Sequence, residues 1–549
     1  MPMKVYTFYT PVISFSKCTK HLIALMLIAG LHIASNQTPH SWAINPDPEK
    51  SLVMSMFPSS IQLNPLHTYT SVEAQAYTAL YEGLVIADPV TLQPIPGIAR
   101  SWTVNETQTK YTFLLREEAR FSDGQVITAQ HFVDTLVAHL TPEGPSPFTG
   151  FLDIVIGARE YRMGNNQPED IGIEAVSDHE LVFKLNHPAP YFLALLAHQS
   201  MVVIHPADLQ LDPYGDHYTP ISSGPFALHE FNNEQIVFRP NPYYWDHARI
   251  ELDEITIELS DDVQSITERF NAGEIQWAKG NFNYSQVNNP SYVLANPLFS
   301  TFFFYFNYRQ QAYRDPLIRT GISLLIPWDE IRSESSFFNP SDQLIPEVPG
   351  YSRVEGLNQK DTERGLELLE QAGYPHGTGL PDITIRIPHG SEQFRLAEIF
   401  QASIEDNTAI SVHIDQQMPT DSYYQNLRTD EYTIASITWI GDYLDPLTFL
   451  MLFISDSGIN EAGHASERFD QLIERSHTQS GEERMKTLSM AEQLLLQEGS
   501  VWPINHTAAF HLVNTHELEG WFSTALDIHP FKFLRRRQLL PGPGITNLR

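Results

Sequence analysis

The sequence predicts an α/β protein of two or more lobes. The chain has 549 residues, more than one hydrophobic core usually serves. Segments typical of strands alternate with segments typical of helices, and most of the expected helices flank strands. Hydrophobic residues make up 42% of the chain, which is ordinary for a folded globular protein and excludes a disordered one.

Local patterns place the expected elements. Strands are expected over residues 51–57, 110–116, 180–185, 201–204, 254–258, 301–307, 383–387, 412–414, 501–504 and 509–513, with a hairpin over 226–238. Helices are expected over residues 72–81, 129–140, 361–372, 393–406, 466–476 and 482–497. Thr128 is an N-cap type residue before the second helix, and Gly373 ends the third.

Residues 1–43 have the pattern of a secretory signal peptide. They contain three lysines and no acidic residue, an apolar block over 22–31, and a small-x-small cleavage site at Ser41-Trp42-Ala43. Cleavage after residues 32–35 is an alternative. Ten apolar residues are about half of what a membrane-spanning helix needs. Cys18 precedes the apolar block, where a lipid-modified cysteine cannot be. We therefore expect a soluble exported protein in the periplasm.

The net charge and the cysteine content exclude some classes of ligand and of chemistry. The formal net charge is −32, and removing residues 1–43 takes it to −35. Such a surface repels nucleic acid and anionic lipid and favours cationic or zwitterionic ligands. The chain without its signal has no cysteine, so it has no disulfide and no thiolate chemistry.

Motifs of enzymes and of metal sites are missing from the sequence. It contains no Gly-x-Ser-x-Gly, no phosphate-binding Gly-x-x-x-x-Gly-Lys motif and no His-Glu-x-x-His. No two of the 22 histidines are three or four residues apart, so no helix offers a local histidine pair to a metal. We predict no catalytic residue, metal or cofactor, although a metal site built from distant histidines stays open. The Arg535–Arg537 run is expected to be an exposed tail.

The segment that includes Trp439, Gly441, Asp442 and Tyr443 is the most informative. An apolar, strand-like run ends at Trp439, and Asp445-Pro446 then opens a helix. Asp at the N-cap and Pro at the first helical position explain Asp445 as a helix start. They do not explain Asp442, so we predict that Asp442 contacts a ligand with a positive group. Two carboxylates three residues apart are also compatible with acid–base catalysis or Ca²⁺ binding.

Three ordered blocks, spread from about residue 52 to the end, then suggest a family. They run over 63–65, 80–85, 96–102, 111–116 and 121–129, over 223–226, 241–245 and 270–275, and over the Trp439–Asp442 motif. Together they resemble the family 5 solute-binding proteins of ABC transporters, which include oligopeptide-, dipeptide- and nickel-binding proteins. The Asp123-Gly124 pair in the first block is turn chemistry and is expected to be structural.

This resemblance implies a type II-like periplasmic binding protein, whose two lobes close like a hinge, with an extra subdomain inserted in the first lobe. The implied organisation is a signal peptide, a first lobe in three pieces, its insert and a second lobe. In order along the chain, the ranges are 1–43 for the signal, 44–82 for lobe I, 83–204 for the insert, 205–309 for lobe I, 310–506 for lobe II and 507–549 for lobe I.

The resemblance also implies the ligand site. In peptide-binding relatives the aspartate of the Trp-x-x-Asp motif pairs with the α-amino group of the peptide, and here that residue is Asp442 beside Trp439. A charge-assisted pair of this kind is strong in a closed cleft. Further contacts are expected from Gly441, Tyr443, Tyr69, Thr70, Ser71, Asn505 and His506, and Phe148 and Phe151 are expected to form aromatic walls.

The chain also departs from the relatives. Some of them carry arginine where this chain has Ser436, and a basic residue where it has Thr78, so anchoring of a ligand carboxylate is open. We predict a monomeric periplasmic component of an ABC importer that delivers short peptides to an inner-membrane permease, with no nucleic-acid partner. The alternatives are a binder of oligosaccharides or of nickel or haem complexes, an exported hydrolase, and a scaffold or chaperone.

Overall fold

A computed structural model describes residues 46–58, 61–67, 70–142, 146–210, 219–334, 339–417, 423–424 and 426–537. The chain forms two units, Met1–Asn45 and Pro46–Arg549, and everything below concerns the second. The predicted signal peptide and Tyr69 lie outside the described residues. Within the described part, no helix is both long and apolar enough to cross a membrane.

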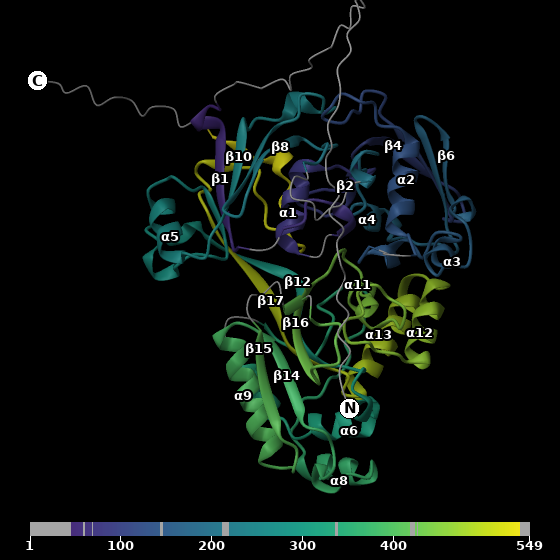
Figure 1. Cartoon of the computed structure of the whole chain (residues 1–549), viewed down its shortest axis with the longest axis vertical. Coiled ribbons are helices and arrows are strands. Elements are labelled where there is room, and N and C mark those ends of the chain that lie inside the picture. Colours follow the sequence, from purple (N-terminus) through teal and green to yellow (C-terminus); the bar gives the residue numbers. More distant parts are fainter. Residues whose placement is uncertain are drawn as a thin grey trace, which may run out of the picture. The chain divides into compact units, whose positions relative to one another are not determined.

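One large mixed sheet forms the frame of the molecule (Figure 1). Its strand order is β15-β14-β16-β12-β17-β11-β1-β10-β9-β8, with β13 pairing β17 outside this path. Their bounds are β1 Ser51–Met56, β8 Phe226–Phe231, β9 Gln235–Pro240, β10 Glu254–Leu259, β11 Trp277–Lys279, β12 Val293–Phe306, β13 Asn339–Pro340, β14 Ile383–Pro388, β15 Val412–Gln417, β16 Ile434–Ile440 and β17 Val501–Val513. We call the part built on β1 and β8–β11 the first lobe, and the part built on β14–β16 the second lobe.

Strands β12 and β17 run side by side from one lobe into the other (Figure 1). Their pairing is regular in the first lobe, breaks between Pro297 and Thr301, and resumes in the second lobe. The expectation of two strands over 501–504 and 509–513 is wrong, because β17 is continuous from Val501 to Val513. Polar side chains interrupt the apolar pattern there, whereas the backbone still pairs with β12. These two strands make the hinge between the lobes.

Residues between α1 and β8 add the separate part that we call the insert. It contains a four-stranded sheet in the order β4-β5-β7-β6 and a hairpin of β2 and β3. The bounds are β2 Val85–Ala87, β3 Pro94–Pro96, β4 Ala99–Val104, β5 Lys110–Leu115, β6 Ile173–Ser177, β7 Glu180–Lys184, α2 Ala129–His139, α3 Ala158–Arg162 and α4 Phe192–Leu196. The insert has its own sheet, as the resemblance implies, while the residue boundaries of the lobes stay predictions.

The strand expected over 201–204 is not formed. Val202 makes only an isolated bridge to Gly83, and the Ile204 amide donates to the Thr135 hydroxyl at 3.1 Å. These apolar residues are buried, and a short buried apolar run does not by itself distinguish a strand from an extended packed segment.

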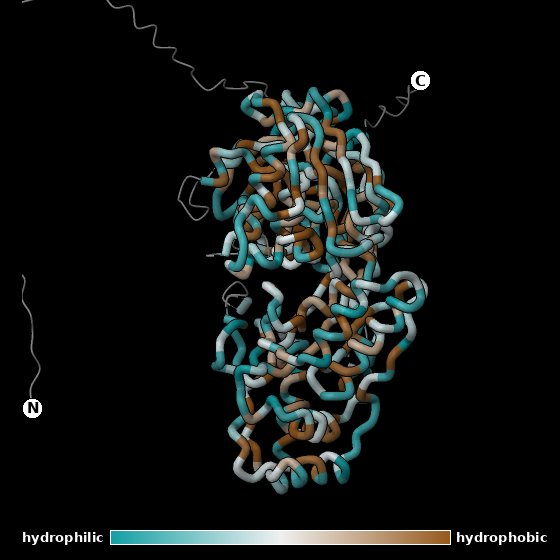
Figure 2. The backbone as a smooth tube through the Cα atoms, turned by 90° about the vertical axis from the view of Figure 1, so that its right-hand side faces the viewer, coloured by the Kyte–Doolittle hydropathy of each residue, from teal (hydrophilic) through white to brown (hydrophobic). Residues whose placement is uncertain are grey.

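Helices cover the sheets in both lobes. Their bounds are α1 Ser71–Leu80 and α5 Val263–Asn271 in the first lobe, and α6 Pro316–Ser323, α7 Trp328–Glu334, α8 Thr362–Gln371, α9 Ser391–Glu405, α11 Leu447–Leu450, α12 Glu467–His477 and α13 Gly481–Gln497 in the second. The chain leaves α8 through Gly373 and α13 through Gly499, both at positive φ, as Gly at a helix end favours. In Figure 2 hydrophobic stretches lie mainly in the interior and hydrophilic stretches follow outer loops.

Separate hydrophobic cores lie under these elements. The first lobe packs around Trp277 and Phe238, and the second around Trp328 and Phe400. The largest cluster is different, because it joins residues of the insert, such as Phe151, to residues of the second lobe, such as Tyr443. The insert therefore packs against the second lobe across the hinge, although its chain connections lead to the first lobe.

Two local predictions have clear outcomes. The Asp123-Gly124 turn is confirmed, since Gly124 has φ of 92° and the Asp123 carboxylate accepts from the Gln125 amide at 2.9 Å. The Arg535–Arg537 run is not a free tail. Arg535–Arg536 form β19, which pairs with β18 (Leu518–Glu519), and these arginines form ion pairs with Glu517 and Glu519. A run of arginines in a sequence indicates that the segment is exposed, but it does not indicate which acidic residues pair with it.

Candidate ligand-binding site

The turn after β16 brings Trp439, Gly441 and Asp442 to the interface between the second lobe and the insert. The Gly441 amide donates to the Phe299 carbonyl of β12 at 2.8 Å. A Cβ at position 441 would lie 2.5 Å from the Phe299 ring, so the close approach of the two segments requires glycine here. Trp439 is buried, and its indole N–H has no acceptor among the described residues.

Asp442 is almost enclosed, with its side chain 9% exposed. One carboxylate oxygen, Oδ2, accepts from the Thr448 hydroxyl at 2.9 Å. The same hydroxyl accepts from the Asp442 amide at 2.9 Å. The other oxygen, Oδ1, lies 3.4 Å from His198 Nε2. Neither neighbour is a permanent cation, so in the described structure the charge of Asp442 is not paired with lysine or arginine.

His198 faces Asp442 with Nε2. Its Nδ1 atom accepts from the Ser200 amide at 3.2 Å and lies 2.7 Å from the Ser200 hydroxyl, so Ser200 fixes which edge of the ring faces the carboxylate. Phe148 and Phe151 pack on the ring with centroid distances of 4.6 and 5.2 Å. The two phenylalanines predicted as aromatic walls thus reach Asp442 through His198, a residue that the sequence analysis did not single out.

Asp445 lies three residues from Asp442 but is fully used by the protein. Arg484 of α13 donates to both carboxylate oxygens, at 2.7 and 2.9 Å, and the Leu447 amide donates at 3.0 Å. The guanidinium carbon also lies 4.6 Å from the Tyr191 ring centroid. The N-cap of α11 is Pro446 and not Asp445 as predicted, although the Asp445 carboxylate does accept from the first amide of the helix. Arg484 neutralises the charge of this carboxylate.

Tyr443 is a core residue of the same interface. Its ring contacts Phe151 and stacks with Tyr191 of the insert, at centroid distances of 5.8 and 6.0 Å. Burial is the first cause that raises the pKa of Tyr443 well above its usual range. It therefore stays neutral and shapes the wall behind Asp442.

The remaining predicted residues lie elsewhere along the hinge and the first lobe. Thr70 is the N-cap of α1 and exchanges hydrogen bonds with Glu73, and Ser71 is the first residue of that helix. Asn505 and His506 lie on β17 opposite Phe302 and Thr301. His506 Nδ1 is 2.9 Å from the Thr301 hydroxyl, and burial lowers its pKa to about 4. The ligand roles of these residues stay predictions.

A cavity of about 70 Å³ lies between the first lobe and the insert, beside His198. Tyr77 and Tyr81 of α1, Ile86 of the β2–β3 hairpin and Ile528 near the C-terminus form part of its wall. Its volume corresponds to about two water molecules or a small apolar group. The imidazole of His198 separates this cavity from the Asp442 carboxylate.

One buried cluster has the residue types of a metal site. His511 Nε2 and His529 Nε2 lie 2.9 and 3.5 Å from the Asp527 carboxylate. Lys279 Nζ lies 2.8 Å from the same carboxylate, and His511 Nδ1 accepts from the Trp277 indole. Burial opposes ionisation, yet the Lys279 charge and the His511 hydrogen bond hold the pKa of Asp527 well below its usual range. The lysine repels a cation, so the donor set fits an ion pair and not a metal.

Comparison with known proteins identifies the fold family. The model of the bacterial extracellular solute-binding proteins, family 5, matches residues 93–461. The chain belongs to this family. Its members are solute-binding proteins by description. The periplasmic oligopeptide-binding protein OppA of Salmonella typhimurium is 27% identical over 497 residues, which cover 86% of this chain and 87% of that protein.

Solved structures of relatives show the same fold. The murein tripeptide-binding protein MppA of Escherichia coli matches with a TM-score of 0.80 at 24% identity, covering 89% of this chain and 99% of that one. Haemophilus influenzae OppA in complex with RPPGFSPFR matches with a TM-score of 0.78 at 22% identity, over 89% and 99% of the two chains. MppA in its unliganded open form matches less well, with a TM-score of 0.62.

Three site residues escaped the sequence analysis: His198, Thr448 and Arg484. Each contacts the Asp442–Asp445 segment, yet two of them are far from it in sequence. A lone histidine or arginine carries no spacing signal. Only Thr448 could have been predicted from the local sequence. It is six residues after Asp442, and a threonine in the first turn of a helix lies near the preceding loop.

Proposed function

We propose that this protein is the periplasmic substrate-binding component of an ABC importer, which captures short peptides between its lobes. It delivers them to an inner-membrane permease and performs no chemistry on them. The names of its relatives OppA and MppA, which describe periplasmic peptide-binding proteins, support this class of ligand. We further propose that it is exported by the signal in residues 1–43 and works as a monomer.

The observation that carries the proposal is that the Asp442 carboxylate is nearly buried and has no arginine or lysine beside it in the described structure. It is contacted by the Thr448 hydroxyl and by Nε2 of His198. A buried carboxylate without a cation is costly. The α-amino group of a peptide supplies that cation and can donate charge-assisted hydrogen bonds to the remaining acceptor sites of the carboxylate.

Other residues would then hold the rest of the peptide. The unpartnered indole N–H of Trp439 can donate to a ligand acceptor, and its ring offers apolar contact. The cavity beside His198 would accept a small apolar side chain near the amino end. The hinge residues Asn505 and His506, and Tyr69, Thr70 and Ser71, are the candidates for contacts along the peptide backbone.

A ligand screen tests this function. Mature protein is partly unfolded, freed of ligand and refolded, and its thermal stability is measured with di- to pentapeptides, their N-acetylated forms, cello- and malto-oligosaccharides, nickel–histidine and haem. We expect free-amine peptides to stabilise the protein and N-acetylation to remove the effect. Stabilisation by sugars or metal complexes alone would overturn the peptide proposal while keeping the family. Turnover of the peptides would revive the hydrolase alternative.

A further inference from the structure

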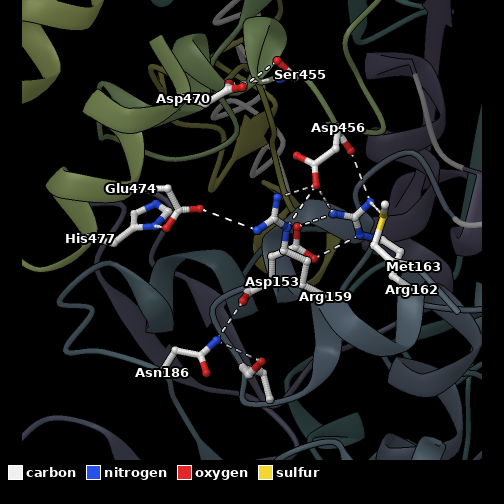
Figure 3. Close-up of polar contacts among 11 residues, drawn as sticks. Asp153, Arg159, Arg162, Met163, Asn186, Ser455, Asp456, Asp470, Glu474 and His477 are labelled. Carbon is white, nitrogen blue, oxygen red and sulfur yellow. Dashed lines mark hydrogen bonds and ion pairs between the residues drawn. The ribbon is translucent and has the colours of Figure 1, made fainter. Parts of the chain in front are cut away.

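A second contact between the insert and the second lobe uses other residues and is ionic (Figure 3). Arg159 and Arg162 of α3 converge on Asp456, which follows α11 in the second lobe. Arg159 donates from Nε and Nη2 to Asp456 Oδ2 at 3.0 and 2.8 Å. Arg162 Nη1 donates to the Asp456 backbone carbonyl at 3.2 Å, and its Nη2 reaches Oδ2 at 3.5 Å. We call Arg159, Arg162, Asp456 and Glu474 the clamp.

The two arginines differ in how they are held. Arg162 is nearly buried, with 6% of its side chain exposed, and pairs within the insert with Asp153. The guanidinium of Arg162 is therefore held in place by the insert itself, independently of its contact with the second lobe. Arg159 is 49% exposed, and its Nη1 also lies 3.8 Å from Glu474 of α12. An exposed pair of this kind contributes little by itself, but fixed geometry and shared partners increase its effect.

The clamp joins two parts of the molecule that are attached to different lobes. The insert is connected to the first lobe, whereas Asp456 and Glu474 lie between β16 and β17 and belong to the second lobe. Opening at the hinge strands β12 and β17 would separate the arginines from these carboxylates. The clamp contacts therefore belong to the closed arrangement, in which Asp442 also meets His198.

We propose that the clamp sets the ligand affinity of the protein by stabilising the closed arrangement, without touching the ligand. A binding site that is complete only in the closed state has an apparent affinity reduced by the fraction of molecules that can close. Weakening the clamp lowers that fraction and weakens every ligand by the same factor. This inference rests on the proposed function only in using peptides as the reporter of closure.

The test uses Asp456→Ala and Arg159→Ala, alone and combined. In Asp456→Ala, Arg162 keeps its partner Asp153, so the insert retains its internal ion pair. We expect Asp456→Ala to weaken peptide binding about three- to tenfold, by the same factor for free-amine peptides of different length. Arg159→Ala should have a smaller effect, and the double variant should bind only slightly more weakly than Asp456→Ala, because it also loses the Arg159–Glu474 contact. Small-angle X-ray scattering of the ligand-free protein should show a larger radius of gyration in Asp456→Ala.

Arg364→Ala is the matched control. Arg364 is 49% exposed, like Arg159, and pairs with Glu367 at 2.8 Å within α8, so its loss crosses no interface. Asp456→Ala that behaves like Arg364→Ala in both affinity and scattering would overturn the clamp. A wild-type protein that binds no peptide would instead contradict the proposed function, and the scattering comparison would still decide the clamp.

Discussion

The insert meets the second lobe at two places that use charge in opposite ways. Around Asp442 the contact is aromatic and largely buried, and the carboxylate has Thr448 and His198 beside it. Around Asp456 the contact is more exposed, and two arginines pair with a single carboxylate. In the described structure the permanent cations are therefore placed at the clamp and beside Asp445, whereas Asp442 receives none.

The comparison separates recognition from closure. A carboxylate already neutralised by arginine cannot discriminate a ligand by its amino group, because its acceptor sites and its charge are used. The charge of Asp442 is not paired with arginine or lysine, so this carboxylate can select. The charge of Asp456 is neutralised by two arginines, so this carboxylate is suited to holding the lobes together. The two sites should respond differently to the same kinds of substitution.

The largest effect is expected at the buried pair next to the ligand site. Arg484→Met leaves the Asp445 carboxylate, 6% exposed as a residue, without its cation. We expect the free energy of unfolding to fall by about 3–5 kcal/mol in urea titrations, because an uncompensated buried charge is costly. The variant Asp445→Asn/Arg484→Met removes that charge and should recover part of the loss. A change below about 1 kcal/mol in the single variant would show that this pair is not structural.

The next largest effect is expected for the selectivity of the ligand site. Asp442→Asn keeps the size of the side chain but removes its charge. We expect calorimetry to show a loss of about 100-fold in affinity for free-amine peptides, the scale of a truncated buried charge pair, and little loss for N-acetylated peptides. Equal losses for both peptide types would contradict the role of Asp442 as the partner of the amino group.

A smaller effect is expected from acidification. The rings of His187 in the insert and His477 in α12 stack at 4.7 Å. Burial, then the charge of His477, lowers the pKa of His187, while Glu474 acts in the opposite direction and Arg484 in the same one. Because protonation of His187 is disfavoured in the closed arrangement, closure is fully stabilised above about pH 6.5 and loses stability as the pH falls through the lowered pKa.

This pH effect has a direct measurement. We expect peptide affinity to be about two- to fivefold weaker at pH 5 than at pH 7.5, and His187→Gln to reduce that ratio. His413→Gln is the control, because His413 is 64% exposed beside Asp382 and far from the stacked pair in sequence. An unchanged ratio in His187→Gln would exclude His187 as the source of the dependence.

Much of this protein could be predicted from its sequence because the signals are local. The apolar alternation of β5, the N-cap residue before α2 and the glycines that end α8 and α13 each act within a few residues. The same holds for the Trp439–Asp442 motif, where an unexplained aspartate beside a helix start is visible in the order of residues. Local features of this kind predicted the α/β class and a ligand contact at Asp442, whereas the family came from the resemblance of ordered motifs along the chain.

Tertiary structure decided what local patterns leave open. It made β17 one strand, because pairing with β12 is a backbone property that polar side chains do not interrupt. It paired Asp445 with Arg484, which is 39 residues away in the sequence. It also placed His198 next to Asp442, although more than two hundred residues separate them in the sequence. Which charges meet depends on how the insert packs on the second lobe. That packing depends on many contacts summed over the whole interface, so it cannot be predicted from any short stretch of the sequence.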